Sequence, residues 1–288
     1  MVDVGLFGPG SVTWRVHADP LMGVAGLRAL LLQALHPVAM EGVSQHSRFR
    51  EDTWGRLRDT AEYVGITTFG TTEEALTAGA RVRAVHATVR GTASVTGRPY
   101  AADDPELLLW VHACLVDSFL TVVRRGGLRL TDAEADAYVA EQVRAAALVG
   151  LEPDVVPATE AALTEHLERT RDHLAVTPAA REAAAYVVAP PMHPVVAVTA
   201  RPAWAGVAGL AFAALPAWAR RTYALPEPPG AAGLTEAATT AALRALRVAL
   251  SGVQAVVPPL REGPHLRAAR ARLADASSDV GGGPGVPS

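Results

Sequence analysis

Apolar residues recur along most of this chain at spacings of three and four, which is the spacing of one helix face. No stretch alternates polar and apolar residues for long enough to indicate a sheet. The pattern predicts helices over residues 20–35, 51–64, 71–89, 105–125, 131–149, 158–174, 178–188, 202–213, 216–223 and 235–256. Short loops and no evident linker join them, which predicts one all-α globular domain over residues 1–275.

The two ends of the chain do not follow this pattern. Residues 1–19 are rich in glycine and proline and are expected to form an irregular arm. Residues 276–288 include "SSDVGGGPGVPS", which is typical of a flexible tail.

Composition supports the helical prediction and excludes several function classes. Hydrophobic residues make up 50 % of the chain and aromatic residues only 5 %, which favours helices over sheets. The net charge of −3 does not indicate nucleic-acid binding. All 26 basic residues are arginine, so no lysine is available for a Schiff base or as an acid or base. The single Cys114 excludes an internal disulfide and a cysteine-rich metal site, and a cytoplasmic location fits it.

The beginning of the chain shows no secretory signal. Two other stretches are apolar enough to be considered for membrane insertion. Residues 20–35 are short and contain Arg28. Residues 194–215 are interrupted by Arg201 and Pro202, which leaves about 13 uninterrupted apolar residues, below the ~20 of a spanning helix. Both are predicted to be buried helices, with peripheral membrane contact as the alternative for the second.

Three histidines lie on or beside predicted apolar helix faces. In "RVRAVHATVRG", His86 belongs to a stripe formed with Val82, Val85 and Val89. His36 ends the helix of residues 20–35, and His112 lies on the apolar face of residues 105–125. Each could be a hydrogen-bonded core residue or a ligand, and a shared three-histidine metal centre is a further alternative, although no HExxH spacing supports it.

A polar group of residues follows in "DTWGRLRDTAEY". Arg56 and Thr60 share a helical face, with Tyr63 one turn further on and Asp59 beside Thr60. Periodicity alone favours a solvated helix face with an Arg56–Asp59 or Arg56–Thr60 contact, and the alternative is a polar patch on the wall of a pocket. In a pocket, the guanidinium could orient an acidic group and the hydroxyl could donate to a bound oxidant.

Three blocks resemble one known family when they are taken in order. They are "QALHPVAMEGVSQHSRFREDTWGRLRDTAEYV", "RVRAVHATVRG" and "GRPYAADDPELLLWVHACLVDSFL", within a resemblance that covers about residues 5–225. The family is that of the MpaB-type oxygenase and the rubber oxygenase (latex-clearing protein). The resemblance implies an all-helical fold with a buried haem pocket. Its rubber-cleaving members are haem b dioxygenases that split the double bonds of polyisoprene, and MpaB-type members oxidise an isoprenoid side chain.

The resemblance also implies roles for particular residues. The block around His86 is similar to the one that supplies the proximal haem ligand. The rubber oxygenase carries Arg-x-x-Lys-Thr on the distal side, so Arg56 and Thr60 match while Asp59 stands at the lysine position. The sixth iron position is then expected to be open, water-bound or capped by His36 or His112. Arg83 and Arg90 flank His86, and we expect them to pair with haem propionates because guanidinium suits carboxylates.

The function expected from the sequence is therefore a haem b-dependent oxygenase acting with dioxygen on a hydrophobic small molecule. Three alternatives remain at this point. The chain could be a haem, gas or lipid carrier without turnover, a haem-free metal enzyme using His36, His86 and His112, or a protein that kept the fold and lost the site. The sequence leaves the oligomeric state open.

Overall fold

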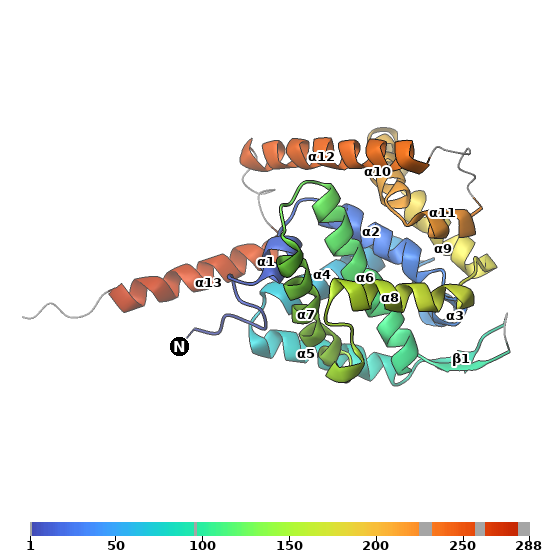
Figure 1. Ribbon diagram of the computed structural model, residues 1–288, viewed down its shortest axis with the longest axis horizontal. Coiled ribbons are helices and arrows are strands. Elements are labelled where there is room, and N and C mark those ends of the chain that lie inside the picture. Colours follow the sequence, from blue (N-terminus) through green and yellow to red (C-terminus); the bar gives the residue numbers. More distant parts are fainter. Residues whose placement is uncertain (1, 95–96, 225–231, 257–262, 282–288) are drawn as a thin grey trace, which may run out of the picture.

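The computed structural model describes residues 2–94, 97–224, 232–256 and 263–281, and nearly all of its regular structure is helical (Figure 1). The longer helices are α2 (Met22–Gln33), α3 (Pro37–His46), α4 (Thr53–Phe69), α5 (Thr72–His86), α6 (Pro105–Arg125), α7 (Asp132–Leu148), α8 (Glu160–Thr170), α9 (Pro178–Val188), α10 (Pro194–Ala213), α12 (Ala232–Val256) and α13 (Pro264–Gly281). The shorter elements are α1 (Val12–His17), α11 (Ala217–Thr222), the 3-10 turns η1 (Pro153–Val155) and η2 (Arg171–His173), and the strands β1 (Arg90–Thr92) and β2 (Pro99–Ala101). The prediction of an all-α single domain is confirmed.

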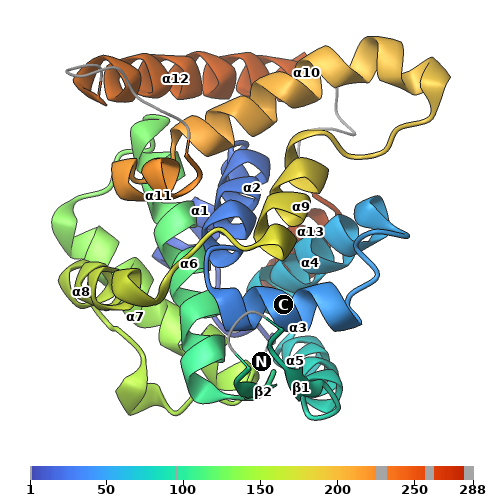
Figure 2. The same cartoon turned by 90° about the vertical axis from the view of Figure 1, so that its right-hand side faces the viewer.

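Helices α2 and α6 form the centre of the molecule and pack against each other. Figure 2 shows α7 and α8 on one side of this pair, α3, α4 and α9 on the other, and α10 and α12 across the top. Helix α6 begins where the sequence predicts it, because Asp104 caps its first turn and Pro105 occupies the first helical position. The core consists mainly of aliphatic side chains with a few large aromatic ones, including Leu21, Leu31, Leu32, Trp110, Val116 and Tyr138.

A buried ion pair joins three elements of this core. Arg28 of α2 is 2 % exposed, and its Nη1 lies 2.7 Å from Asp117 Oδ2 and 2.6 Å from Ser118 Oγ, both on α6. Its Nε donates to the carbonyl of Ala214, just after α10, at 2.9 Å. The arginine that argued against a membrane span in residues 20–35 is therefore satisfied inside the protein.

A second buried polar contact holds α1 against α4 and α7. The His17 ring has Nδ1 at 2.7 Å from Thr68 Oγ1 and Nε2 at 3.1 Å from the Tyr138 hydroxyl. Burial lowers the pKa of His17 to about 3, so the ring is neutral at pH 7. One ring nitrogen then donates a hydrogen bond and the other accepts one.

The structure differs from the sequence prediction in short or strongly polar segments. The expected arm of residues 1–19 contains α1, whose first turn is closed by the Ser11 hydroxyl accepting from the Trp14 N–H at 3.1 Å. The expected loop after residue 96 contains β2, which pairs antiparallel with β1. Helices α3 and α13 were not predicted, and α13 runs to Gly281, past the expected start of the tail. Residues 282–288 lie outside the described residues.

The prediction that residues 194–215 form a buried helix holds only for the second half of α10. Ala208 and Ala211 are fully buried against the core, whereas Val195 and Val198 are 75 % and 79 % exposed. Figure 2 shows the first half of α10 extending along the top of the molecule and the second half descending toward α2.

Gly79 in α5 permits a close approach that any larger residue prevents. A Cβ atom there would lie 2.7 Å from the carbonyl oxygen of Leu148 at the end of α7. We expect Gly79→Ala to lower the free energy of unfolding by about 1–3 kcal/mol, because backbone must move to relieve the overlap. The matched control is Gly26→Ala in α2, where a Cβ meets nothing within 4 Å, so the change is expected to be neutral or stabilising. Urea unfolding of both variants measures the difference, and equal stability would contradict the prediction.

Candidate functional site

Helices α4 and α5 form a hairpin that carries most of the residues singled out by the sequence. Asp52 caps α4 by accepting from the Gly55 N–H at 2.8 Å. A capping box begins α5, in which the Thr71 hydroxyl accepts from the Glu74 N–H and the Glu74 carboxylate accepts from the Thr71 N–H. The two helices pack against each other, with Gly70 between them. Across this hairpin the Arg56 charge acts on the pKa of His86 and the Arg83 charge acts on that of Tyr63, which places each arginine near its partner.

His86 is the last residue of α5 and its imidazole is half-buried. Burial lowers its pKa, and the positive charge of Arg56 on α4 lowers it further, so the ring is neutral at pH 7. Its Nδ1 atom is buried and has no hydrogen-bond partner among the described residues. A neutral imidazole with an unsatisfied nitrogen is the form in which histidine binds a metal.

Arg56 is exposed on α4, and its positive charge acts on His86. The surrounding protein lowers the pKa of Arg56, against the influence of the nearby Asp59 carboxylate. The pocket-wall interpretation and the solvated-face interpretation of the polar residues on α4 both stay predictions.

Tyr63 and Thr60 extend the polar face of α4. Burial raises the pKa of Tyr63 to about 12, with the charge of Arg83 opposing the shift, so the phenol stays protonated at neutral pH. The Thr60 hydroxyl donates to the Arg56 carbonyl at 2.9 Å, which leaves its oxygen available as an acceptor. The Tyr63 hydroxyl is thus a proton donor on the part of α4 that lies near Arg83.

The two arginines expected to bind propionates have protein partners. Arg83 donates to the carbonyl of Leu148, an interaction that uses no counter-charge. Arg90 forms a two-pronged ion pair with Asp103, at 3.1 Å and 2.8 Å, on the exposed side of the hairpin β1–β2. A propionate that binds Arg90 would have to replace the Asp103 carboxylate. The contact of Arg83 is with a neutral carbonyl, so its positive charge is not neutralised by that contact. The propionate roles stay predictions.

The other two histidines lie in different surroundings. His36 caps α3, with Nδ1 accepting from the Ala39 N–H at 3.2 Å, and its ring centroid lies 6.0 Å from that of Trp110. His112 on α6 is half-buried, and burial lowers its pKa to about 4. Across the described ranges, no group of three His, Cys, Asp or Glu side chains is arranged to hold a metal. The alternative of a three-histidine metal centre is therefore wrong, and one reason is that the capping hydrogen bond occupies His36 Nδ1.

The apolar stripe predicted around His86 is not a core face. Val85 is 59 % exposed, and Val89 lies beyond the end of α5. The buried side of α5 is instead formed by its small residues Ala75 and Gly79. His86 is thus oriented by the end of a helix and by α4, and not by a surrounding apolar core.

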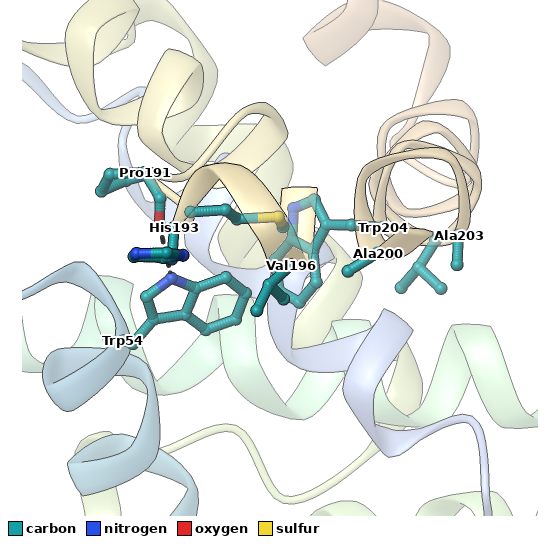
Figure 3. Close-up of a pocket in the computed structure, with 9 residues that line it drawn as sticks. Trp54, Pro191, His193, Val196, Ala200, Ala203 and Trp204 are labelled. Carbon is teal, nitrogen blue, oxygen red and sulfur yellow. Dashed lines mark hydrogen bonds between the residues drawn. The ribbon is translucent and has the colours of Figure 1, made fainter. Parts of the chain in front are cut away.

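A separate cavity of about 460 Å³ lies between α4 and the first half of α10, a size typical of small-molecule sites (Figure 3). Trp54 and Trp204 form its aromatic walls, with ring centroids 4.8 Å apart and planes at 72°. The Trp54 Nε1–H donates to the Pro191 carbonyl at 2.7 Å, so both rings present apolar surface to the cavity. Trp54 and Arg56 are two residues apart and leave α4 in different directions, and Arg56 is not among the residues that line the cavity.

Sequence reasoning missed this cavity. Its walls come from residues 54, 191–193 and 196–207, which are far apart in the chain. The available signal was the run "PPMHP" before α10, whose prolines hold an extended stretch next to two tryptophan-bearing helices.

The chain was compared with known proteins. The family model described as "ER-bound oxygenase mpaB/B'/Rubber oxygenase, catalytic domain" matches residues 14–249. Uncharacterized protein Mb2261 of Mycobacterium bovis and uncharacterized protein Rv2237 of Mycobacterium tuberculosis are each 35 % identical to it over 128 residues. That match covers 44 % of this chain and 49 % of each relative, so the chain spans about half the length of the curated relatives it matches. No solved structure matches the chain.

Proposed function

Because this chain belongs to the family of the ER-bound oxygenase mpaB/B' and the rubber oxygenase, and matches its catalytic domain, we propose that it is a haem b-dependent oxygenase. The substrate we propose is a hydrophobic, isoprenoid-like small molecule that is oxidised with dioxygen. In this proposal His86 would hold the haem iron, and Arg56 and Thr60 would belong to the wall of the haem pocket.

The observation that carries the proposal is the state of His86. Its ring is neutral, and its Nδ1 is buried without a partner within the described part of the chain. A buried polar atom without a hydrogen bond costs free energy, which a bound partner would recover. Histidine is a common axial ligand of haem iron, so the residues present fit this cofactor.

The chain's own residues supply binding and polarity, while the haem, when bound, supplies the activation of dioxygen. Burial lowers the pKa of His86 and the positive charge of Arg56 lowers it further, which favours the neutral imidazole that a ligand requires. The Tyr63 hydroxyl stays protonated because burial keeps its pKa high, so it can donate a hydrogen bond. Asp59 replaces the lysine of the rubber oxygenase pattern, so this part of the chain would offer the iron no amine.

The first test is the absorption spectrum of protein expressed with a haem precursor, before and after dithionite and carbon monoxide. We expect an intense haem band in the wild type and a loss of haem occupancy of at least about tenfold in His86→Ala, since removal of an axial ligand removes the main bond to the iron.

The matched control is His173→Ala, since that histidine is exposed in the turn η2. We expect its haem occupancy to equal that of the wild type. Full occupancy and an unchanged spectrum in His86→Ala contradict the ligand assignment, and absence of haem from the wild type contradicts the oxygenase proposal.

Oxygen uptake separates an enzyme from a haem or lipid carrier. Reduced holoprotein that consumes dioxygen with an unsaturated isoprenoid, and loses this activity in Arg56→Gln while keeping its haem, acts as an oxygenase. A normal haem spectrum without uptake on any unsaturated lipid supports the carrier.

A further inference from the structure

The top of the molecule is a layer made of the first half of α10 and the length of α12 (Figures 1 and 2). We call it the outer layer and define it by its most exposed apolar residues, which are Val195, Val198, Leu234 and Val248. Helix α5 lies on the opposite side of the molecule (Figure 1). The outer layer is therefore remote from the hairpin of His86.

Helix α12 has an apolar face that is turned outward. Residues at helical spacing along its exposed side are Leu234, Ala238, Ala241, Ala245 and Val248, and all of them are exposed. Its buried side is also apolar, because Leu243 packs fully into the core. A surface helix of a soluble protein normally places charged residues on the face that α12 fills with alanine, valine and leucine.

The first half of α10 repeats this feature. Two helices in the described ranges are long and apolar enough to cross a membrane, α6 and α10. The most apolar window of α6 is 61 % buried, as expected of a core helix, whereas that of α10 is only 17 % buried. Exposed apolar surface of this extent on two neighbouring helices is typical of an interaction site.

A membrane-spanning role for α10 does not agree with its packing. Its second half contributes Ala208 and Ala211 to the core, and the Ala214 carbonyl just beyond it binds the buried Arg28. Pulling α10 into a bilayer would break these contacts. The geometry instead matches a helix that lies in the plane of the interface with one side in the protein.

Charge distinguishes a lipid surface from other partners. In the described residues of α10, α11 and α12 the exposed charged residues are Arg201, Arg221, Arg244 and Glu236, whereas Arg220 is buried and Arg247 pairs with Asp19. Arg201 follows Val198 by one helical turn on the exposed face of α10, and Arg244 is exposed at the edge of the apolar face of α12, near Gly127. Long arginine side chains can keep their charge at the headgroups while neighbouring valines enter the apolar region.

We propose that the outer layer binds the surface of a bilayer containing anionic lipids, with α10 and α12 lying in the interface. The apolar faces supply burial, and Arg201 and Arg244 supply attraction to the headgroups. This inference does not depend on haem binding.

The test is co-sedimentation of the full chain with vesicles of phosphatidylcholine alone and of phosphatidylcholine with about 30 % phosphatidylglycerol. We expect stronger binding to the anionic vesicles, weakened by high salt because the attraction is screened. The double variant Arg201→Gln/Arg244→Gln is expected to lose roughly 25-fold in partition to anionic vesicles, about fivefold for each arginine. The double variant Val198→Asp/Val248→Asp is expected to lose at least about tenfold on both kinds of vesicle.

The matched controls lie on α5, on the opposite side of the molecule. Leu76 is 53 % exposed, so Leu76→Asp introduces the same charge at a similar exposed apolar residue, and Arg81→Gln removes one exposed arginine. Both should leave partition within about twofold of the wild type. All of these changes are at exposed positions, and thermal unfolding verifies that each variant is folded.

Three results would overturn the proposal. The first is that the wild type binds neither kind of vesicle. The second is that the outer-layer variants bind as well as the α5 controls do. The third is that light scattering shows a dimer of the wild type, which Val198→Asp/Val248→Asp converts to a monomer. The outer layer is then an interface between two copies of the chain.

Discussion

Asp117→Asn is expected to lower the free energy of unfolding by about 3–5 kcal/mol, one of the two largest effects in this chain. Arg28 is 2 % exposed and keeps its positive charge at any pH compatible with folding. The new amide keeps an oxygen that can accept a hydrogen bond but has no charge, so the cation is left buried beside neutral partners, among them the Ser118 hydroxyl and the Ala214 carbonyl. An uncompensated buried charge is among the most destabilising defects in a protein core.

A double-mutant cycle separates loss of the pair from loss of one partner. The variant Arg28→Met/Asp117→Asn removes both charges and fills part of the volume, so it should be more stable than Asp117→Asn alone. Urea unfolding at pH 7.5 gives the four stabilities. Glu165→Gln serves as the control because its pair with Arg169 is exposed, and we expect a change below about 1 kcal/mol. Asp117→Asn with a similarly small cost contradicts the prediction.

Acidification from pH 7.5 to pH 5.0 is expected to remove about 4 kcal/mol of stability through His17 and His112. Burial lowers the pKa of His17 to about 3 and that of His112 to about 4, from an ordinary value of 6.5. At pH 5.0 both rings are protonated in the unfolded chain and neutral in the folded one. The unfolded state therefore binds more protons than the folded state. The free energy of unfolding decreases as the pH falls below about 6.5, and the loss at pH 5.0 is about 2 kcal/mol for each ring.

Urea unfolding at the two pH values measures this loss, and His17→Asn supplies the comparison. The variant is less stable than the wild type at both pH values because the contacts to Thr68 and Tyr138 change. The loss of stability between pH 7.5 and pH 5.0 should be about 2 kcal/mol smaller in the variant than in the wild type, because the contribution of His17 is absent. The lowered pKa values of His36, His86 and His166 act in the same direction. Equal pH dependence in the variant and the wild type would show that His17 is protonated in the folded protein.

Long helices with strong caps were predictable from sequence, whereas segments defined by tertiary contacts were not. Helix α6 has an Asp-Pro start, an apolar face and a diglycine end, and each of these local signals agrees with the fold. Helix α1 has only six residues, and it is held by a Ser11 cap and by the carboxylate of Glu141, 129 positions away from Val12. Strand β2 has three residues and exists because it pairs with β1.

The candidate site shows the same division. The spacing of Arg56, Thr60 and Tyr63 correctly placed them on one helix, because that relation is local. The proximity of Arg56 to His86 depends on how α4 packs against α5, and periodicity carries no information about it. The stripe of Val82, Val85 and Val89 illustrates the limit, since Val85 is 59 % exposed although the spacing favours burial.

Two of the five tryptophans of the chain stand edge to face on the wall of the cavity between α4 and α10. Indole rings at a centroid separation of 4.8 Å couple their electronic transitions, and the coupling changes with small rotations of either ring. The near-ultraviolet circular dichroism of this protein therefore contains an intrinsic optical report on Trp54 and Trp204. Any molecule that enters between α4 and α10 can be followed through that signal without an attached dye.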